Sequence, residues 1–159
     1  MAVDTFIKIG DLKGESVVKG HEDSIQIESW SWGMAQSGTT HSGTGGGAGK
    51  CDVQDLSFQK RMDTSSPGIA LAVCKGTHFD KATMTCRKAG DTPLDYLIIE
   101  LEEVIVTSYS PSGSSGGDEV YDSFTLNFAK FKMSYQPQDN KGAKAGGTVD
   151  AEYNIAENV

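Results

Sequence analysis

Apolar and polar side chains alternate with a period of two through most of the chain, and this pattern predicts a protein built mainly of β-strands. The longest such segment covers residues 94–109, where Leu97, Ile99 and Leu101 share one parity. The other expected strands cover residues 3–9, 24–34, 51–60, 78–88, 119–135 (with a bulge or bend near Ala129) and 149–155. Turns rich in glycine, serine and aspartate separate these segments. The predicted fold class is therefore mainly β, a sandwich or barrel of about seven or eight strands.

One segment has helical rather than strand spacing. Ile69 and Val73 lie four residues apart on an apolar stripe. Pro67 suits the first turn of a helix, and Gly76 suits the residue that follows its last turn. The pattern predicts one short helix at about residues 66–75, and no other convincing helix in the chain.

Residues 35–50 form a low-complexity stretch of glycine, serine and threonine between two expected strands. The stretch is longer than most hairpin loops, and we expect a long flexible excursion, because long loops in compact domains are usually functional or disordered. Its end, Gly49-Lys50, superficially resembles a phosphate-binding loop. That motif, however, requires glycine where Thr44 stands and serine or threonine where Cys51 stands, so no nucleotide site is expected here.

The long segment at residues 94–109 carries apolar side chains of both parities, because Ile98, Val104 and Val106 alternate with the first set. Two apolar faces on one strand imply that both faces are covered. A single barrel of 159 residues covers the outer face of such a strand only with help from a neighbour. The pattern therefore favours a ring of subunits joined by a repeated heterologous interface.

The chain has 159 residues, which fits a single domain over residues 1–159. Its formal net charge of −8 argues against nucleic-acid binding and against a basic membrane-binding patch. The first residues show no basic region followed by an apolar run, and no window reaches the ~18 apolar residues of a membrane span. We therefore expect a chain that folds in the cytoplasm, lacks a cleavable signal peptide and does not insert into membranes.

The three cysteines, Cys51, Cys74 and Cys86, are expected to be reduced thiols, because an odd number at wide spacing does not form a disulfide framework. Cys74, His78 and Cys86 match no standard zinc spacing. No metal or other cofactor is expected, and the sequence assigns the cysteines no role.

Two pairs of side chains leave other functions open. Glu100 and Glu102 share one face of an expected strand and could form the carboxylate pair of a hydrolase, although a charged stripe on a sheet is the simpler interpretation. The chain has no Gly-x-Ser-x-Gly motif, and no enzyme activity is expected. Trp30 and Trp32 point the same way on a strand. They could form a carbohydrate or peptide site in a monomeric barrel, and burial in the core is the alternative.

Seven segments follow one another in a recognisable order. They are Phe6–Ser16 (FIKIGDLKGES), Ser29–Gly33 (SWSWG), Asp55–Phe58 (DLSF), Arg87–Gly90 (RKAG), Tyr96–Ile99 (YLII), Val106–Ser108 (VTS) and Tyr135–Gln138 (YQPQ). Taken together, and running nearly end to end, they resemble the haemolysin-coregulated protein (Hcp) family, the tube protein of bacterial type VI secretion systems. No single segment is decisive; the ordered set is specific.

The resemblance implies a single β-barrel with one short flanking α-helix, and six subunits that close into a hexameric ring. Rings would stack into a tube inside a contractile sheath, and sheath contraction would expel the tube from the cell. The channel of the ring would hold small effector proteins. The implied partners are further copies of the chain, the sheath, spike and baseplate proteins, and these effectors.

The resemblance also assigns residues to the channel and to the ring faces. Ser31 would face the channel, while Trp30 and Trp32 would point into the barrel core. Contacts between stacked rings would involve Gly90 and Asp91 on one face of the ring and Glu157 on the other.

The low-complexity stretch is the third assigned element. It would reach a neighbouring subunit or ring, and its inter-subunit residues would be Gly38, Gly45, Gly46 and Gly47.

Overall fold

The computed structural model describes residues 2–38 and 48–159, and within these ranges the chain forms eleven strands and one helix. The elements are β1 (Val3–Ile9), β2 (Ile25–Ile27), β3 (Ser29–Ser31), β4 (Met34–Gly38), β5 (Ala48–Val53), β6 (Leu56–Arg61), α1 (Ser66–Lys75), β7 (His78–Lys88), β8 (Leu94–Ser112), β9 (Tyr121–Asn127), β10 (Lys130–Tyr135) and β11 (Val149–Asn154). The mainly β class with a single short helix is therefore confirmed.

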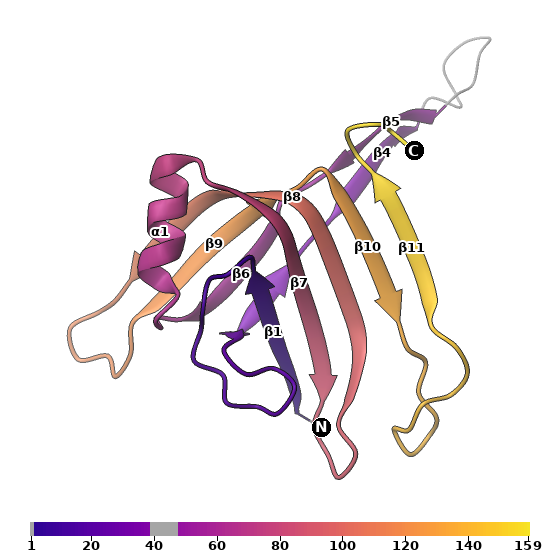
Figure 1. Cartoon of the computed structure of the whole chain (residues 1–159), viewed down its shortest axis with the longest axis horizontal. Helices are drawn as coiled ribbons and strands as arrows, with labels where there is room; N and C mark the ends of the chain where they lie inside the picture. Colours follow the sequence, from indigo (N-terminus) through magenta and orange to yellow (C-terminus); the bar gives the residue numbers. More distant parts are fainter. Residues whose placement is uncertain (1, 39–47) are drawn as a thin grey trace.

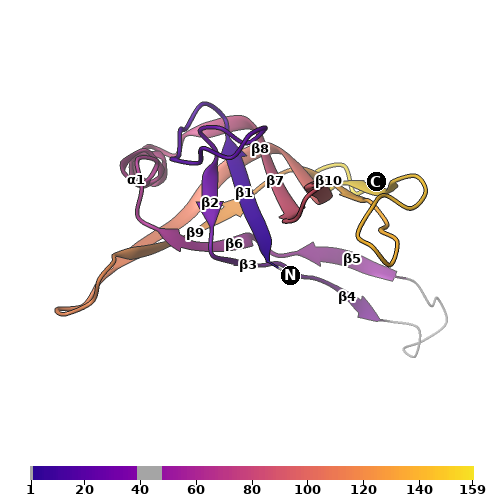
Figure 2. The ribbon, with the colours of Figure 1, turned by 90° about the horizontal axis from the view of Figure 1, so that it is seen from below.

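Nine strands form one antiparallel sheet that curls around the core (Figures 1 and 2). Its hydrogen-bonded order is β2-β1-β7-β8-β9-β6-β3, and β10 pairs with β8 and carries β11 on its other side. The two ends of this path, β2 and β3, are separated only by Glu28, whose N–H donates to the carbonyl of Gln59 in β6 (2.8 Å). One bent segment thus borders both ends of the sheet. Closure into a complete barrel stays a prediction that this short link supports.

The hydrophobic core lies inside the curl. Alternate positions of neighbouring strands supply it, and the rings of Phe58 on β6 and Phe124 on β9 stack with centroids 4.9 Å apart. Other fully buried side chains are Ile7, Ile9, Ile25, Leu56, Met84, Ile99, Leu101 and Leu126. Burying an aliphatic side chain of this size contributes about 1.5–3 kcal/mol, so the curl is held mainly by this cluster.

The outer face of β8 differs from the expectation. Glu103 has a positive φ of 53°, and Glu102 and Glu103 are both exposed. This local bulge switches the parity of the strand, so Val104 and Val106 turn into the same core as Leu101. The expected second apolar face was therefore wrong for Val104 and Val106, whereas Ile98 is half-buried and is not one of the buried core residues.

Helix α1 begins and ends as the sequence predicts. Pro67 occupies the first turn, and Gly76, with φ of 61°, donates its N–H to the carbonyls of the last turn. Ile69 and Ala72 are buried, and the helix packs against β8 at one side of the sheet (Figure 1). Within the described ranges, no helix is long and apolar enough to cross a membrane.

Several strand boundaries differ from the expected ones. The segment at 24–34 is interrupted at Glu28, where two consecutive exposed residues shift the parity before Trp30. The expected strand at 119–135 divides into β9 and β10 around Ala129, which confirms the predicted bend.

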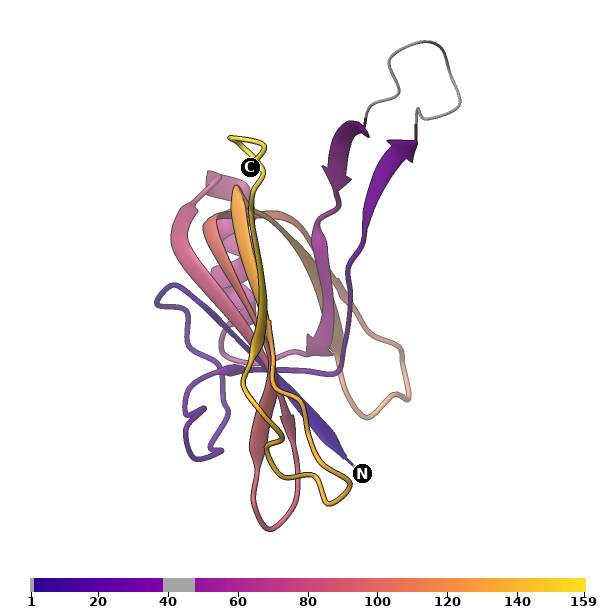
Figure 3. The same cartoon turned by 90° about the vertical axis from the view of Figure 1, so that its right-hand side faces the viewer.

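The low-complexity stretch is more ordered at its ends than expected. Strands β4 and β5 pair as an antiparallel hairpin, with Met34 opposite Val53 and Gly38 opposite Ala48. Part of the stretch expected to be a flexible excursion therefore forms paired strands at both flanks, where small residues hide the alternation. The hairpin stands away from the curled sheet as a separate two-stranded ribbon (Figure 3).

Candidate functional site: a hydroxyl face on four strands

Four neighbouring strands present small polar side chains on the side opposite the core. Cross-strand register forms one row of Ser31, Ser57, Thr125 and Ser108, and a second row of Ser29, Gln59, Ser123 and Ser110. Residues two apart on a strand share a face, so the rows lie side by side. All eight residues are exposed or half-buried. We call them the hydroxyl face, because seven carry a hydroxyl group and none is ionisable.

The hydroxyl face rests on a packed support. Phe58 and Phe124 lie between the two rows in sequence and point into the core, where they stack on each other. On the outer side, Ser108 Oγ lies 2.6 Å from Thr125 Oγ1. A shallow hollow of about 390 Å³ on this face is lined by Ser29, Trp30, Ser31, Ser57, Phe58, Gln59 and Ser123. The surface is therefore a fixed sheet of hydrogen-bonding groups rather than a mobile loop.

Charged side chains lie at the two ends of the hydroxyl face. At one end, Asp55 accepts hydrogen bonds from Thr107 Oγ1 (2.7 Å) and Asn127 Nδ2 (2.9 Å). At the other end, the guanidinium of Arg61 pairs with Glu28 (3.1 Å) and with Glu119 (2.9 Å). Because the basic group is neutralised by its neighbours, the surface between the two ends carries no charge of its own.

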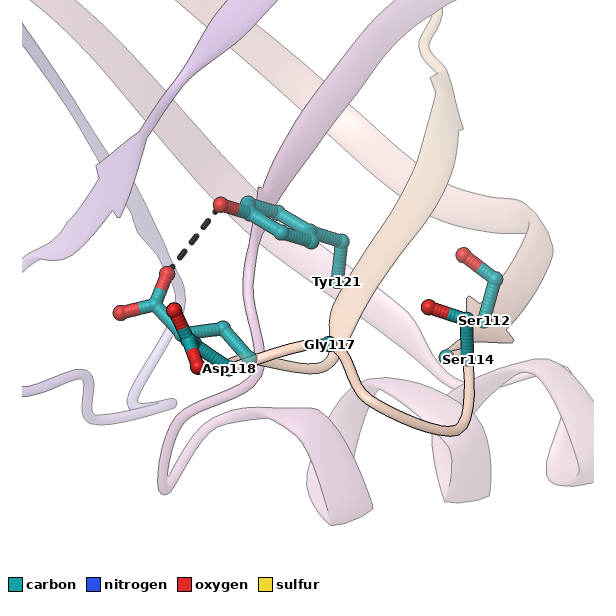
Figure 4. Close-up of a pocket in the computed structure, with 7 residues that line it drawn as sticks. Ser112, Ser114, Gly117, Asp118 and Tyr121 are labelled. Atoms are coloured by element: carbon teal, nitrogen blue, oxygen red, sulfur yellow. Dashed lines mark hydrogen bonds between the residues drawn. The ribbon is translucent and has the colours of Figure 1, made fainter.

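An open bowl of about 660 Å³ continues beyond the Arg61 end (Figure 4). Ser112, Ser114, Gly117, Asp118 and Tyr121 line it, and the Tyr121 hydroxyl donates to Glu119 Oε2 (3.1 Å). Glu119 binds both Arg61 and Tyr121, so it connects the bowl to the Arg61 end of the hydroxyl face. The bowl therefore extends this end of the surface.

A buried charged network lies beneath the hydroxyl face. Lys60 is fully buried, and its Nζ lies 3.0 Å from Asp122 Oδ1, 3.1 Å from Asp63 Oδ1 and 2.7 Å from Ser66 Oγ. The network ties the first turn of α1 to β6 and β9. The sequence analysis missed it, although Lys60 has the inward parity of Leu56 and Phe58 and could have been noticed as a cation at a core position.

Tyr109 completes this network from β8. Its hydroxyl donates to Asp122 Oδ2 (2.7 Å). Burial, together with this hydrogen bond to a carboxylate, raises the pKa of Tyr109 to about 12. The phenol therefore stays protonated and acts as a fixed hydrogen-bond donor. It supports the ion pair between β6 and β9 from the neighbouring strand β8.

The residues expected at the channel and in its vicinity lie close together. Ser31 is exposed in the first row of the hydroxyl face. Trp30 and Trp32 are half-buried against the core, and Trp32 Nε1 donates to the Gln54 carbonyl (2.8 Å) while its ring meets Phe131 edge-on at 4.9 Å. This places both indoles in the packing of the sheet, and the channel role of Ser31 stays a prediction.

The expected stacking residues lie at opposite ends of the molecule. Gly90 and Asp91 are exposed in the turn between β7 and β8, and Glu157 is exposed beside the C terminus. Figure 1 shows that turn at the bottom of the view, near the N terminus, and the C terminus at the top. Gly38 ends β4, whereas Gly45, Gly46 and Gly47 lie outside the described residues.

The carboxylate pair considered for hydrolysis is part of a surface ion-pair ladder. Glu100 lies 3.5 Å from Lys81 Nζ, and Glu102 lies 3.9 Å from Lys130 Nζ. Within residues 2–38 and 48–159, no group of three or more histidine, cysteine, aspartate or glutamate side chains is placed to hold a metal ion. The chemistry that the described surface offers most clearly is hydrogen bonding.

Comparison with known proteins relates this geometry to one family. The chain matches the family described as "Type VI secretion system effector, Hcp" over residues 6–135. It is 53% identical to Protein hcp1 of Pseudomonas aeruginosa, over 100% of this chain and 99% of that protein. A solved type six secretion system protein has a similar fold (TM-score 0.93, 28% identity, 99% of both chains covered). Hcp1 from Salmonella typhimurium is also similar (TM-score 0.81, 31% identity, 100% and 99% covered).

A family match over most of the chain and a relative of this identity over its whole length agree with the ordered segments found in the sequence. The chain therefore belongs to the Hcp family and is a component of the type VI secretion tube.

Proposed function

We propose that six copies of this chain close into a ring whose channel is lined by the hydroxyl face, and that the channel holds small effector proteins before secretion. The hydroxyl face carries this proposal. Ser31, the residue expected to face the channel, lies within an uncharged polar surface that continues across four strands. All eight residues of this surface lie opposite the core and are exposed or half-buried, so they are accessible to another molecule.

The chemistry of the hydroxyl face suits reversible contact with varied proteins. Each hydroxyl group donates and accepts hydrogen bonds and can rotate to fit its partner. A neutral hydrogen bond exchanged with water contributes only about 0.5–1.5 kcal/mol, so affinity depends on several contacts at once. Six copies around one channel would supply many such contacts, and none would need a specific charge on the effector.

We further propose that the rings stack through their two end faces. The position of Gly90 and Asp91 at one end and Glu157 at the other supports this arrangement, since stacked rings meet end to end. A repeated contact between unlike surfaces of the same chain continues without limit and produces a tube.

The remaining partners follow from the same proposal. The contractile sheath surrounds the tube, the baseplate and spike lie at its tip, and contraction expels the tube and its effectors from the cell. Hcp proteins are secreted by the type VI system, and the acidic, hydroxyl-rich surface of this chain supports a protein that stays soluble on both sides of the envelope.

Electron microscopy and sedimentation velocity of the purified chain test the ring directly. The expected particle is an open ring with about six times the 16.9 kDa mass of the chain. Replacing Ser31 by a cysteine in a chain that also carries Cys51→Ser and Cys74→Ser, and labelling it with gold-tagged maleimide, should place the label on the inner wall. A monomer at every concentration would contradict the ring, and label on the outer wall would contradict the assignment of the channel face.

A further inference from the structure

One end of the hydroxyl face contains a series of hydrogen bonds that runs from a carboxylate to an exposed serine. A β-bulge creates it, because Ser108 on β8 lies opposite Thr125 on β9, and the register shift before Ser108 leaves Thr107 as an extra residue. The hydroxyls of Thr107 and Ser108 therefore both reach the hydroxyl of Thr125. We call the four residues the Asp55 network; they are Asp55, Thr107, Thr125 and Ser108.

The network begins at the carboxylate of Asp55, which can only accept hydrogen bonds. Its Oδ2 lies 2.7 Å from Thr107 Oγ1, and its Oδ1 accepts from Asn127 Nδ2 at 2.9 Å. Thr107 has a single hydroxyl proton, and the other acceptor within its reach, the Thr125 carbonyl, is uncharged and lies farther away at 3.3 Å. The Thr107 hydroxyl therefore donates to Asp55, because a short hydrogen bond to an ionised acceptor is the stronger one.

The directions of the other two hydroxyl protons follow by elimination. Thr125 Oγ1 lies 2.6 Å from Thr107 Oγ1, and at this distance one hydroxyl must donate to the other. Since the Thr107 proton is already used, Thr125 donates to Thr107. Ser108 Oγ lies 2.6 Å from Thr125 Oγ1, so for the same reason Ser108 donates to Thr125. The O–H bonds of all three residues thus point along the network toward Asp55.

Ser108 ends the network with no proton left to donate. Its side chain is exposed, and its Oγ offers only lone pairs to a second molecule, unlike a free hydroxyl that rotates to donate or to accept. Hydrogen bonds in series polarise one another, so an oxygen at the end of a series anchored on a carboxylate accepts more strongly than the oxygen of an isolated serine. This corner of the hydroxyl face therefore favours a partner that donates.

We propose that Asp55 makes this end of the channel wall selective for neutral N–H donors of the effector, namely the side-chain amides of asparagine and glutamine and unpaired backbone N–H groups. The inference rests on the proposed binding of effectors to the hydroxyl face and adds the chemical groups that the face selects. The selected donor is neutral because the network ends on an uncharged serine, whereas the Asp55 carboxylate is half-buried and already accepts two hydrogen bonds. Asp55 acts through Ser108 and is a positioning residue.

Titration of purified rings with two small amides tests this selectivity. Acetamide carries N–H donors, whereas N,N-dimethylacetamide has the same carbonyl group and no donor. In rings with isotope-labelled threonine methyl groups, acetamide should shift the nuclear magnetic resonance signals of Thr107 and Thr125 at least about threefold more than N,N-dimethylacetamide does. Equal shifts would overturn the proposed preference. A larger response to methylammonium chloride than to acetamide, measured against sodium chloride, would overturn the neutral class of the donor.

Asp55→Asn is the decisive variant, because it can reverse the network without changing its shape. The asparagine oxygen still accepts from Asn127, while its nitrogen takes the place of Oδ2 and donates to Thr107. Thr107 then donates to Thr125, and Ser108 regains a proton for a second molecule. The preference for acetamide should disappear in Asp55→Asn and persist in Asp118→Asn, which removes an exposed carboxylate of the β8–β9 loop. A preference retained in Asp55→Asn would refute the role of Asp55.

A second variant guards against an effect of Asp55→Asn on folding. Thr125→Val keeps the shape of the side chain and removes the hydroxyl in the middle of the network, so Ser108 is again free to donate. The acetamide preference read from the Thr107 methyl signal should be lost here as well, in rings that sediment like the wild type. An unchanged preference in Thr125→Val would contradict the transmission from Asp55 to Ser108.

Retention of a co-expressed small effector separates failure of this inference from failure of the proposed function. Asp55→Asn should lower retention in purified rings at least about threefold, and Asp118→Asn should leave it unchanged. Unchanged retention in Asp55→Asn, together with loss of the effector in the bulky first-row variant Ser57→Arg, would overturn the donor preference alone. Unchanged retention in both Asp55→Asn and Ser57→Arg would overturn binding to the hydroxyl face and the inference with it.

Discussion

Lys60 on β6 and Asp122 on β9 are direct cross-strand partners, with Nζ 3.0 Å from Oδ1 and no part of either side chain exposed to solvent. The pair joins two strands of the hydroxyl face on their core side, and Ser66 connects it to the first turn of α1. A buried ion pair of this kind contributes less through its attraction than it costs when one partner is removed.

Removal of one partner should therefore be strongly destabilising. Lys60→Met leaves Asp122 buried without its cation, and we expect the free energy of unfolding to fall by about 3–5 kcal/mol. Urea unfolding at fixed protein concentration measures this loss, since ring formation also stabilises the folded chain. Lys81→Met is the matched control, because its pair with Glu100 is exposed and should contribute about 0–1 kcal/mol. Equal losses in the two variants would show that burial of Lys60 is unimportant.

Acid should weaken the attachment of the β1–β2 loop through Asp95. Arg87 Nε lies 2.6 Å from Asp95 Oδ1, and His21 of the loop lies 3.2 Å from Oδ2 and stacks on Phe6 at 4.6 Å. Burial acts to raise the pKa of the Asp95 carboxyl. The hydrogen bond from Arg87 and the charges of His21 and Arg87 outweigh burial, and the pKa lies below its ordinary value.

The sign of the pH effect follows from this lowered pKa. The ionised carboxylate contributes its full stability above the unfolded pKa of about 3.9, and the contribution is lost as pH falls through the lower folded pKa. Asp95→Asn should remove this part of the acid dependence, while Asp118→Asn in the exposed β8–β9 loop should leave it unchanged. The check is the midpoint of urea unfolding between about pH 6 and pH 3; parallel curves for the wild type and Asp95→Asn would refute the assignment.

Effector binding should be sensitive to bulk on the hydroxyl face and insensitive to salt. Ser57→Arg places a long cation in the first row beside Ser31, and we expect retention of a co-expressed small effector in purified rings to fall about tenfold, or about 1.4 kcal/mol. The control is Thr83→Arg. Thr83 is a small polar residue on β7 that also faces away from the core but is not part of the hydroxyl face. Retention by the wild type should change less than about threefold between 0.05 and 0.5 M salt, because no ion pair is broken. Loss of the effector in high salt would point instead to the charged ends of the face.

Two glycines with similar backbone conformations should respond differently to alanine. Gly10 and Gly76 both have positive φ, 52° and 61°. An alanine Cβ at Gly10 would lie 2.6 Å from Phe79 Cδ1, whereas nothing lies within 4 Å at Gly76. Gly76→Ala should cost about 1–2 kcal/mol from the left-handed conformation alone. Gly10→Ala should cost more, since the Phe79 ring must also move, and thermal unfolding of both variants compares them.

The period-two alternation was sufficient to predict the strand class, because it reports which side of each strand meets the core, and the helix was predicted from the four-residue spacing of Ile69 and Val73 between Pro67 and Gly76. The alternation failed where the backbone changes parity. Glu103 adopts a positive φ inside a long strand, and the sequence shows this only as two consecutive glutamates among apolar residues. The same failure hid the interruption at Glu28.

The candidate site shows the same limit. Ser31 could be singled out through the family segments, but its neighbours in the rows, such as Thr125 and Ser108, come from strands far apart in sequence. Only the register aligns them, and register depends on long-range pairing that no local pattern encodes. Lys60 was overlooked because a lysine is normally exposed, and its partners Asp122 and Ser66 are brought to it only by the fold.

In a channel built from the hydroxyl face, a moving protein would meet little friction. Hydroxyl groups exchange hydrogen bonds with water as readily as with a passing protein surface. No single contact therefore holds the protein in the channel long enough to resist its sliding. The nearby charges lie at the ends of the face, where Arg61 is paired with two carboxylates and Asp55 accepts hydrogen bonds from Thr107 and Asn127. A wall of serines can thus retain a protein at rest through many weak contacts and still discharge it when the tube is emptied.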